Sequence, residues 1–216
     1  MTNIPGIFAA GECEYQYHGA NRLGANSLVS CIFGGFRAGP IAITYAKSLP
    51  AAEGDGGHAA EVKRQSEINS KLMGNEGTEN PFKLWRELGE TMTKHATVIR
   101  YNKGLEAADN KIIELMDRYK KVNLSDRSQW ANTSFAFARQ LYNMLELSRV
   151  VVGGAILRDE SRGAHYKPDF PDRNDEKFLK TTKASFTGQG SKPRFEFEAV
   201  DIQFIKPRPR RYDAVK

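Results

Sequence analysis

The stretch "NKGLEAADNKIIELMDRYKKV", residues 102–122, decides the fold of this chain. Its apolar side chains recur at alternating intervals of three and four residues, which places them along one face of a helix. These side chains belong to Leu105, Ala108, Ile112, Leu115, Tyr119 and Val122. A helix with such a seam buries it against neighbouring helices, so we expect this segment to belong to an antiparallel bundle.

Helices are predicted on both sides of this segment. Before it, Asn80 is a good N-cap and Pro81 suits the first helical position. The helix that they open carries one apolar face, formed by Leu84, Trp85, Leu88 and Met92. After it, a helix over residues 129–158 has a stripe of Phe137, Leu141, Leu145, Ser148 and Val152. Because the connections are short, we predict an up-down-up three-helix bundle over residues 80–160.

The pattern changes at both ends of the bundle. Residues 161–216 begin with an irregular, proline-punctuated segment and continue with two alternating runs, "KTTKASF" and "RFEFEAVDIQF", separated by the turn-rich "TGQGSKP". These runs predict a C-terminal β-hairpin region. Residues 51–79 are predicted to be a linker and a helix, because "SLPAAEGDGGHAA", residues 48–60, is rich in glycine and also contains proline. The predicted fold class is therefore mainly α with a small β part.

The first part of the chain, residues 1–50, has its own pattern. "IPGIFAAGE", residues 4–12, is a short apolar run that predicts a buried strand ending at a tight turn. A glycine-rich loop follows, and Asn26 or Ser27 then offers a good N-cap for a helix.

The predicted helix continues to about Gly39. The surrounding segment, residues 28–46, is apolar, but Arg37, Pro40 and three glycines interrupt it. These interruptions favour a buried helix over a membrane span.

Composition narrows the classes of function. The chain has 216 residues, a formal net charge of +6 and 27% charged residues, with most basic residues interleaved with acidic ones. One basic cluster, "KPRPRRYDAVK" at residues 206–216, is one-sided and is interpreted as a solvated tail, so we expect no nucleic-acid partner. The two cysteines, Cys13 and Cys31, have neither CxxC spacing nor a histidine cluster nearby, so neither a disulfide framework nor a metal site is expected.

The loop "HGANRLGANSL", residues 18–28, has the composition of an anion site. A helix that begins near Ser27 directs unpaired N–H groups and a partial positive charge towards whatever lies in front of it. Gly19 and Gly24 allow a close backbone approach, and Arg22 has a planar set of donors suited to a carboxylate or phosphate. The alternative is a capped helix whose arginine forms a surface salt bridge. The residues alone leave both interpretations open.

Two long segments resemble the succinate dehydrogenase/fumarate reductase flavoprotein family. "IPGIFAAGECEYQYHGANRLGANSLVSCIFGGFRAG" resembles the end of its flavin-binding domain, and "RDESRGAHYKPDFPDRNDEKFLKTT" resembles its C-terminal signature. "GNEGTENPFKLWRELGETMTKHATVIR" and the helices after it also fit, so the resemblance covers essentially the whole chain. L-aspartate oxidase is a near relative with HGANRL and an ESRG-type block. Gly24-Ala25 and the run "HYKPDFPDRNDEKFLKTT" favour succinate dehydrogenase.

The resemblance implies roles for five residues. Glu12 matches the acid that accepts hydrogen bonds from hydroxyl groups of FAD. Ser27 and Leu28 match the pair whose backbone lies at the pyrimidine edge of the flavin, where a helix N-terminus stabilises the reduced form. Arg22 matches the arginine that binds a carboxylate of succinate or fumarate. His18 either helps to bind this dicarboxylate or orders the loop, and the second role is preferred. No residue of the chain is assigned a catalytic role.

The second block, "ESRGAH" at residues 160–165, has two interpretations. It flanks the active site, or it is a hydrogen-bonded seam that docks the bundle onto the flavin domain, which is the preferred reading. The chain contains no GxGxxG-type turn for the FAD pyrophosphate. We therefore expect residues 1–50 to be the truncated end of an α/β FAD-binding domain, and the chain alone neither to hold FAD firmly nor to catalyse.

The resemblance also implies an assembly. The full subunit is expected to oxidise succinate to fumarate and to pair with an iron–sulfur subunit and a membrane-anchor cytochrome subunit. It is then peripheral to the cell membrane, on the cytoplasmic side. A non-catalytic interaction or docking module is the alternative from another class.

Overall fold

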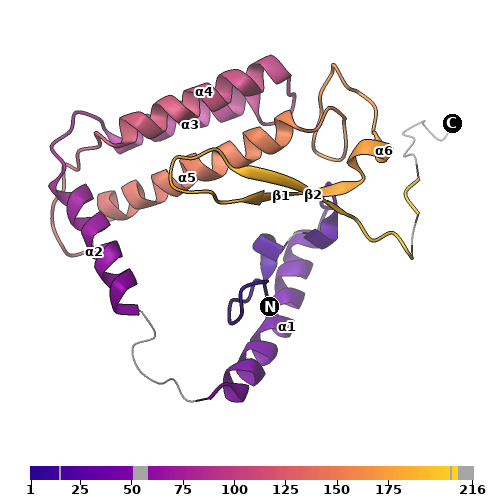
Figure 1. Cartoon of the computed structure of the whole chain (residues 1–216), viewed down its shortest axis with the longest axis horizontal. Helices are drawn as coiled ribbons and strands as arrows, with labels where there is room; N and C mark the ends of the chain where they lie inside the picture. Colours follow the sequence, from indigo (N-terminus) through magenta and orange to yellow (C-terminus); the bar gives the residue numbers. More distant parts are fainter. Residues whose placement is uncertain (15, 51–57, 205, 209–216) are drawn as a thin grey trace.

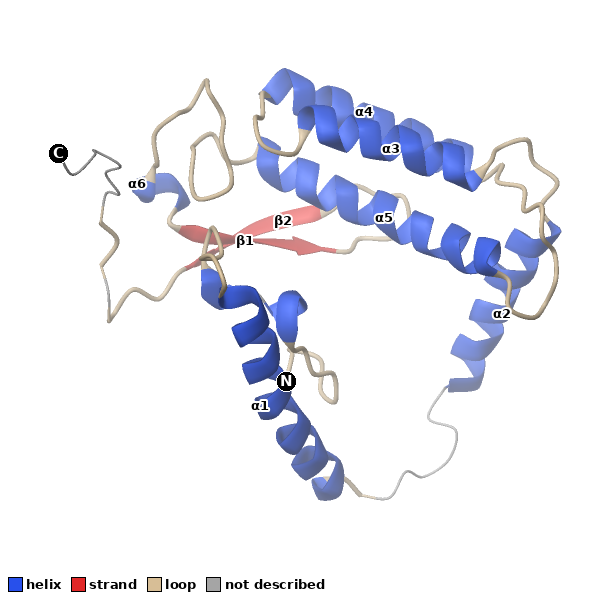
Figure 2. Cartoon of the chain, turned by 180° about the vertical axis from the view of Figure 1, so that it is seen from behind, coloured by secondary structure: helices blue, strands red, loops and turns tan. Residues whose placement is uncertain are grey.

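The computed structural model describes residues 1–14, 16–50, 58–204 and 206–208. The predicted basic tail and the centre of the predicted linker, residues 51–57, therefore lie largely outside the described residues. The described chain is mainly helical with one two-stranded antiparallel sheet, which confirms the predicted fold class (Figures 1 and 2). The elements are the 3-10 helices η1 (Gly11–Glu14) and η2 (Gln16–His18), helices α1 (Asn26–Ser48), α2 (His58–Gly74), α3 (Pro81–His95), α4 (Asn102–Tyr119), α5 (Thr133–Ile156) and α6 (Asp175–Phe178), and strands β1 (Lys180–Ser185) and β2 (Arg194–Ala199).

Helices α3, α4 and α5 pack against one another, and consecutive helices run in opposite directions (Figure 1). The side chain of Asn80 accepts hydrogen bonds from the backbone N–H groups of Phe82 and Lys83, as the N-cap prediction requires. The predicted seam is confirmed, with Leu105, Ala108, Ile112, Leu115 and Val122 all fully buried. Tyr119 is half-buried and donates its hydroxyl hydrogen to the carbonyl of Ala138 at 2.8 Å. The bundle is therefore the hydrophobic core of the chain.

Charged side chains tie the outer surface of α3 to α4. The Arg118 guanidinium donates to Glu87 at 2.7 Å and to Glu79 at 2.8 Å. The hydrogen bonds from Arg118, together with those from Lys111, lower the pKa of Glu87 to about 2. The ion pair between Glu87 and Arg118 therefore stabilises the folded state relative to the unfolded chain, where Glu87 has its ordinary pKa.

We expect Glu87→Gln to flatten the acid limb of the stability curve. Because the pKa of Glu87 falls on folding, its contribution is fully present above its ordinary pKa of 4.5 and is lost as the pH falls towards 2. The free energy of unfolding of the variant should be lower by up to roughly 1 kcal/mol at pH 7 and by little at pH 2. The loss at pH 7 is this small because the ion pair is partly exposed. Urea unfolding at both pH values measures this, with the exposed Glu90→Gln on the same helix as the control. An equal loss at both pH values would contradict the assignment.

The β1–β2 hairpin packs against α5 (Figure 2). The predicted hairpin is confirmed, and its register pairs Lys180 with Ala199 and Ser185 with Arg194. The Arg149 guanidinium is buried and donates to the carbonyl of Gly190 in the hairpin turn at 3.1 Å. A strand pair of this size is marginal alone, so its docking on the helix stabilises it.

Two adjacent glycines of α5 should respond oppositely to substitution by alanine. A Cβ atom at Gly153 would lie 2.8 Å from the ring of Phe195, whereas one at Gly154 would make ordinary contacts at 3.7 Å. We expect Gly153→Ala to cost roughly 1–3 kcal/mol through overpacking. Gly154→Ala should raise the free energy of unfolding by about 0.5–1 kcal/mol, because alanine favours the helix more than glycine does. Thermal unfolding of the two variants measures this, and the same sign in both would refute it.

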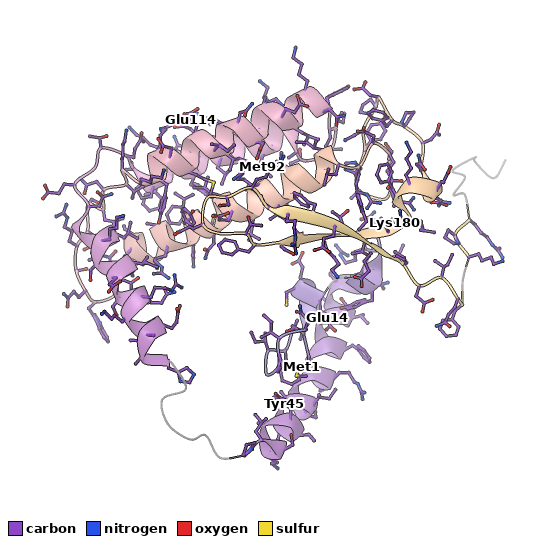
Figure 3. The ribbon with its side chains drawn as sticks, in the orientation of Figure 1. Met1, Glu14, Tyr45, Met92, Glu114 and Lys180 are labelled. Atoms are coloured by element: carbon purple, nitrogen blue, oxygen red, sulfur yellow. The ribbon has the colours of Figure 1, made fainter. Side chains whose placement is uncertain are left out.

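The predicted strand over residues 4–12 is wrong. These residues pair with no other strand in the described chain, and Gly11–Glu14 forms η1. Ile4 and Ile7 are more than half exposed. Residues 4–7 instead form a turn, in which the N–H group of Ile7 donates to the carbonyl of Ile4 at 3.2 Å. Phe8 then contacts Tyr45 of α1 edge-on at 5.9 Å (Figure 3, with Tyr45 labelled).

Three expectations for the next helix also fail. Asn26 is the first helical residue and not the cap, because Ala25 is the N-cap, in the left-handed region at a φ of 66°. The helix continues past Gly39 to Ser48, because Pro40 removes only one helical N–H group. Its predicted burial is wrong as well, since Gly34 is its only buried residue.

By length and composition alone, helix α1 is also long and apolar enough to cross a membrane, with a mean hydropathy of 1.3 over an 18-residue stretch. Leu28 is 73% exposed and Phe36 is 76% exposed. Among the described elements, η1 packs against α1, where Gly34 lies against Gly11 and Ala10.

Candidate functional site

The N-terminus of α1 is open and presents hydrogen-bond donors. Ala25 has no side chain that can cap the helix, and the N–H group of Asn26 donates to the carbonyl of Leu23 at 3.3 Å. The N–H groups of Ser27 and Leu28, in the first turn, have no acceptor within the helix. The partial positive charge of the helix is concentrated at this end. The arrangement therefore suits an anionic or electron-rich ligand.

Arg22 lies in the loop ahead of this helix end and is exposed. One nitrogen of its guanidinium donates to the carbonyl of Leu23 at 3.1 Å, which holds the side chain against its own loop. No acidic partner pairs with Arg22 among the described residues, so the expected alternative of a surface salt bridge is not seen there. Its remaining donors are available to a ligand.

His18 is attached to the first turns of α1. Its Nε2 atom lies 3.3 Å from the hydroxyl oxygen of Ser30, and that hydroxyl donates to the carbonyl of Ser27 at 2.8 Å. The imidazole also contacts the ring of Tyr17, with centroids 4.6 Å apart. These contacts join the loop to the first turns of α1.

Glu12 is exposed in η1, which two glycines bring close to α1. Gly11 is buried and has a φ of 78°, which glycine adopts without strain. A Cβ atom at Gly34 would lie 3.1 Å from the nitrogen of Gly11, so a larger residue on the helix would need η1 to shift by a few tenths of an ångström. Glu12 and the open helix end thus belong to one packed unit (Figure 3 labels the neighbouring Glu14).

The block at residues 160–165 forms a hydrogen-bonded seam. Glu160 is fully buried and accepts from Arg158 at 2.6 Å, from Arg162 at 2.9 Å and from the N–H group of Asn174 at 3.0 Å. Burial alone would raise the pKa of Glu160, but these hydrogen bonds outweigh it and hold the pKa below its usual value. The carboxylate is therefore charged, and it joins the end of α5 to the segment before α6.

His165 extends this seam towards the α3–α4 connection. Its Nδ1 atom lies 2.7 Å from a guanidinium nitrogen of Arg100, and its Nε2 atom lies 2.9 Å from the carbonyl oxygen of Arg158. Because a guanidinium only donates, Nδ1 must accept and Nε2 must carry the hydrogen. Burial lowers the pKa of His165, and the neighbouring cations lower it further. The imidazole is therefore neutral and bridges two loops.

The seam also reaches the Arg22 loop. The N–H group of Ala164 donates to the carbonyl of Ala20 at 3.3 Å, so residues far apart in the sequence meet beside Arg22. The preferred reading of residues 160–165 as a seam that docks the bundle onto the flavin domain anticipated that these two parts meet, but it did not identify Ala20 as the residue in contact. The signal was present in Gly163, which has a φ of 59° and packs directly against Ala20.

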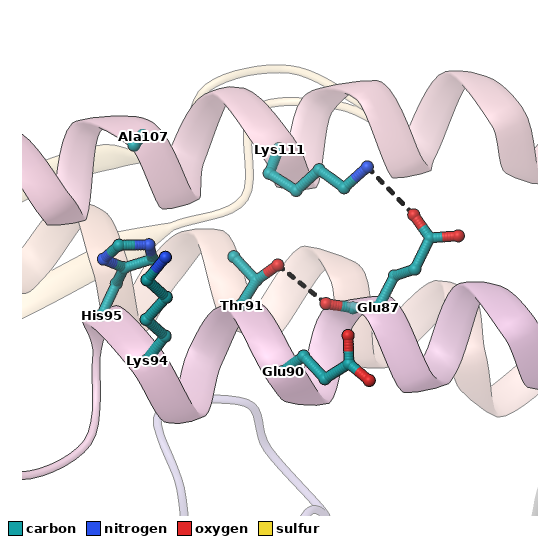
Figure 4. A pocket seen from close by; sticks show the side chains of 7 residues that line it. All are labelled: Glu87, Glu90, Thr91, Lys94, His95, Ala107 and Lys111. Carbon is teal, nitrogen blue, oxygen red and sulfur yellow. Dashed lines mark hydrogen bonds and ion pairs between the residues drawn. The ribbon is translucent and has the colours of Figure 1, made fainter.

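A surface pocket of about 380 Å³ lies between α3 and α4, away from this region (Figure 4). Its lining residues are Glu87, Glu90, Thr91, Lys94, His95, Ala107 and Lys111. Lys111 pairs with Glu87 at 2.9 Å, and Thr91 donates to the carbonyl of Glu87 at 2.7 Å. These groups serve the bundle surface. Within the described residues, no three His, Cys, Asp or Glu side chains gather as a metal site.

Comparison with protein families supplies the class of the chain. Residues 1–28 match a family described as FAD binding domain, which places the loop and helix end in a flavoprotein. Residues 85–212 match the family described as fumarate reductase flavoprotein C-term. The chain therefore belongs to the succinate dehydrogenase/fumarate reductase flavoprotein family.

Relatives agree with this assignment over the whole chain. The succinate dehydrogenase flavoprotein subunit of Bacillus subtilis is 50% identical over 219 residues, covering 100% of this chain and 37% of its own length. The fumarate reductase flavoprotein subunit of Haemophilus influenzae is 35% identical, covering 99% and 35%. A structure of quinol fumarate reductase from E. coli superimposes with a TM-score of 0.86 at 30% identity, covering 94% of this chain and 35% of that one. The chain thus spans little more than a third of the length of these relatives.

Proposed function

We propose that this chain is the C-terminal part of a succinate dehydrogenase flavoprotein, which oxidises succinate to fumarate. The observation that carries the proposal is the 50% identity to the Bacillus subtilis subunit over the entire chain. The exposed Arg22 ahead of an open helix end supports it, because both a dicarboxylate and a flavin need such donors. In this proposal, residues 1–50 are the end of the FAD-binding domain, and residues 80–160 are a separate helical bundle of the same subunit.

The backbone groups at the helix end and the Glu12 side chain in η1 fit the FAD that the family implies. The first-turn N–H groups of Ser27 and Leu28 offer donors to an electron-rich ring edge, and the exposed Glu12 carboxylate offers acceptors to hydroxyl groups. FAD supplies the hydride acceptor for the oxidation of a CH–CH bond. In the proposal, the partial positive charge of α1 stabilises negative charge on that edge.

Arg22 binds the substrate in this proposal. Its guanidinium holds one carboxylate of succinate through a planar pair of hydrogen bonds, which fixes the orientation of the methylene carbons. His18 orders the loop through Ser30, as its 3.3 Å contact supports.

The finer assembly is part of the same proposal. The relatives are named as flavoprotein subunits, so they act within larger complexes. We propose an iron–sulfur subunit as the direct electron acceptor and a membrane-anchor cytochrome subunit beyond it. The flavoprotein then lies at the cytoplasmic side of the membrane.

A hybrid subunit tests the function. In it, this chain replaces the matching segment of the Bacillus subtilis subunit, and the product is assayed for dye reduction with succinate and with aspartate as reductants. We expect reduction with succinate and bound flavin, whereas the separate 216-residue chain is expected to remain colourless after gel filtration. A hybrid that binds flavin but is reduced only by aspartate would point to L-aspartate oxidase. A hybrid that is stable but binds no flavin would favour a docking module.

A further inference from the structure

We infer that the turn formed by residues 162–165, here called the seat, positions the Arg22 loop for ligand binding. This inference rests on the proposed function for its substrate. Its structural basis is the contact between the seat and Ala20, two residues before Arg22. Gly163 and Ala164 act as positioning residues and do not touch the ligand.

The seat is a tight and well-defined turn. The N–H group of Arg162 donates to the carbonyl of His165 at 2.8 Å, and the N–H group of His165 donates back to Arg162 at 3.0 Å. Gly163, at the first central position, has a φ of 59°. A positive φ at this position is what type II′ turns require, and glycine adopts it without strain. The tip, Gly163-Ala164, therefore has a defined backbone shape.

Both flanks of the seat are anchored to the bundle side of the molecule. On one flank, Arg162 donates to the buried carboxylate of Glu160 at 2.9 Å. On the other, His165 contacts Arg100 at 2.7 Å and the carbonyl of Arg158 at 2.9 Å. The hydrogen bonds from Arg162 and Arg100 are charge-assisted, and such bonds are short and directional, so the seat cannot move without breaking them.

The tip fits closely against the Arg22 loop. Ala164 donates to the carbonyl of Ala20 at 3.3 Å. A Cβ atom at Gly163 would collide with that carbonyl oxygen and would lie 2.8 Å from the Cβ atom of Ala20. Any side chain at Gly163 must therefore push the loop away from the seat. Because Arg22 otherwise bonds to its own neighbour Leu23, this displacement carries the guanidinium with it.

The first test is Gly163→Ala in the hybrid subunit. Displacing a substrate-holding group by about 1 Å costs on the order of 100-fold, so we expect kcat/KM for succinate to fall by that factor, with a rise in KM. The matched control is Gly190→Ala, which places alanine at a φ of 75° in the hairpin turn with no atom closer than 3.9 Å. The control should lose comparable thermal stability and keep its KM. Equal KM values in the two variants would overturn the inference.

The second test uses rescue at His165. His165→Ala removes both anchors of one flank and should raise the KM for succinate. The His165→Gln side chain has an amide oxygen that can accept from Arg100 and an amide N–H that can donate to the Arg158 carbonyl. The KM of this variant for succinate should therefore return most of the way to that of the unsubstituted hybrid. If glutamine fails to improve on alanine while both proteins fold, the flank does not act by positioning.

Amide hydrogen exchange on the 216-residue chain separates this inference from the proposed function. In the chain with its own sequence, the Ala164 amide should be protected, and Gly163→Ala should speed exchange of that amide and of residues 19–24. If the exchange responds but the unsubstituted hybrid does not oxidise succinate, the seat stands and the proposed function fails. If the hybrid is active and the exchange does not respond to Gly163→Ala, the seat is wrong and the function stands.

Discussion

Arg22→Gln in the hybrid subunit is expected to lower kcat/KM for succinate by at least about 100-fold, because the clamp on the substrate carboxylate is lost. Glutamine keeps much of the length of the side chain but supplies neither the charge nor the paired donors. The kcat/KM of Arg22→Lys should lie between that of the unsubstituted hybrid and that of Arg22→Gln, since a single ammonium group restores the charge without the planar geometry. Steady-state kinetics that separate kcat from KM measure the effect. A loss confined to KM would mean that Arg22 binds substrate and transition state equally.

Arg37→Gln is the matched control. Arg37 is exposed at the middle of α1, the helix that follows the Arg22 loop, and the family resemblance gives it no substrate role. The control should retain its activity and its flavin. If Arg22→Gln is as active as Arg37→Gln, then Arg22 is not the dicarboxylate clamp, and the glycine-rich loop serves only to begin α1.

Glu160→Gln is expected to cost about 3–5 kcal/mol of unfolding free energy, because it leaves two arginines without their buried charged partner. Glu160 is fully buried and accepts from Arg158 and Arg162. Glutamine matches its shape, so no cavity forms and the loss reports the charge alone. Urea unfolding of the 216-residue chain at pH 7 measures it.

The control for this prediction is an exposed pair. Glu198 lies 3.3 Å from Lys183 across the hairpin, and both side chains are more than half exposed. Glu198→Gln should change stability by less than about 1 kcal/mol. If Glu160→Gln costs no more than Glu198→Gln, the buried network contributes specificity of structure and not stability.

The bundle was predictable from the sequence because its information is local. The spacing of Leu105, Ile112 and Leu115 predicts which face of the helix is buried, and the pair Asn80-Pro81 predicts where α3 begins. These signals depend on helix geometry alone and need no knowledge of distant residues. The hairpin was predictable for the same reason, since its two runs alternate and are joined by a segment rich in turn-forming residues.

The N-terminal part was predicted less well, because its conformation depends on partners. The apolar run at residues 4–12 was predicted to be a buried strand, but a strand forms only if a neighbouring strand exists to pair with it. The end of α1 was misplaced because Pro40 is a breaker in general but is tolerated within this helix. Apolar composition also predicted burial of α1, but composition does not say which segment covers it.

The candidate site was predicted in its parts but not in its arrangement. The loop with Arg22 and the helix start near Ser27 could be recognised from residue types, and they lie together in the structure. The approach of Ala164 to Ala20 joins segments with most of the chain between them. No spacing rule reports such a contact. The reading of residues 160–165 as a docking seam indicated that the two parts meet, but not that Gly163 and Ala164 touch Ala20.

That contact also bears on the order in which the chain folds. The bundle consists of consecutive helices with short connections, so its contacts cost little loop-closure entropy and can form early. The meeting of Ala20 with Ala164 closes one of the longest loops in the chain, and it needs the turn at residues 162–165 to exist first. We therefore expect Arg22 to reach its final place late, after the bundle and its seam have formed. The ligand-binding loop would then be the last part of the chain to become native and the first to be lost on unfolding.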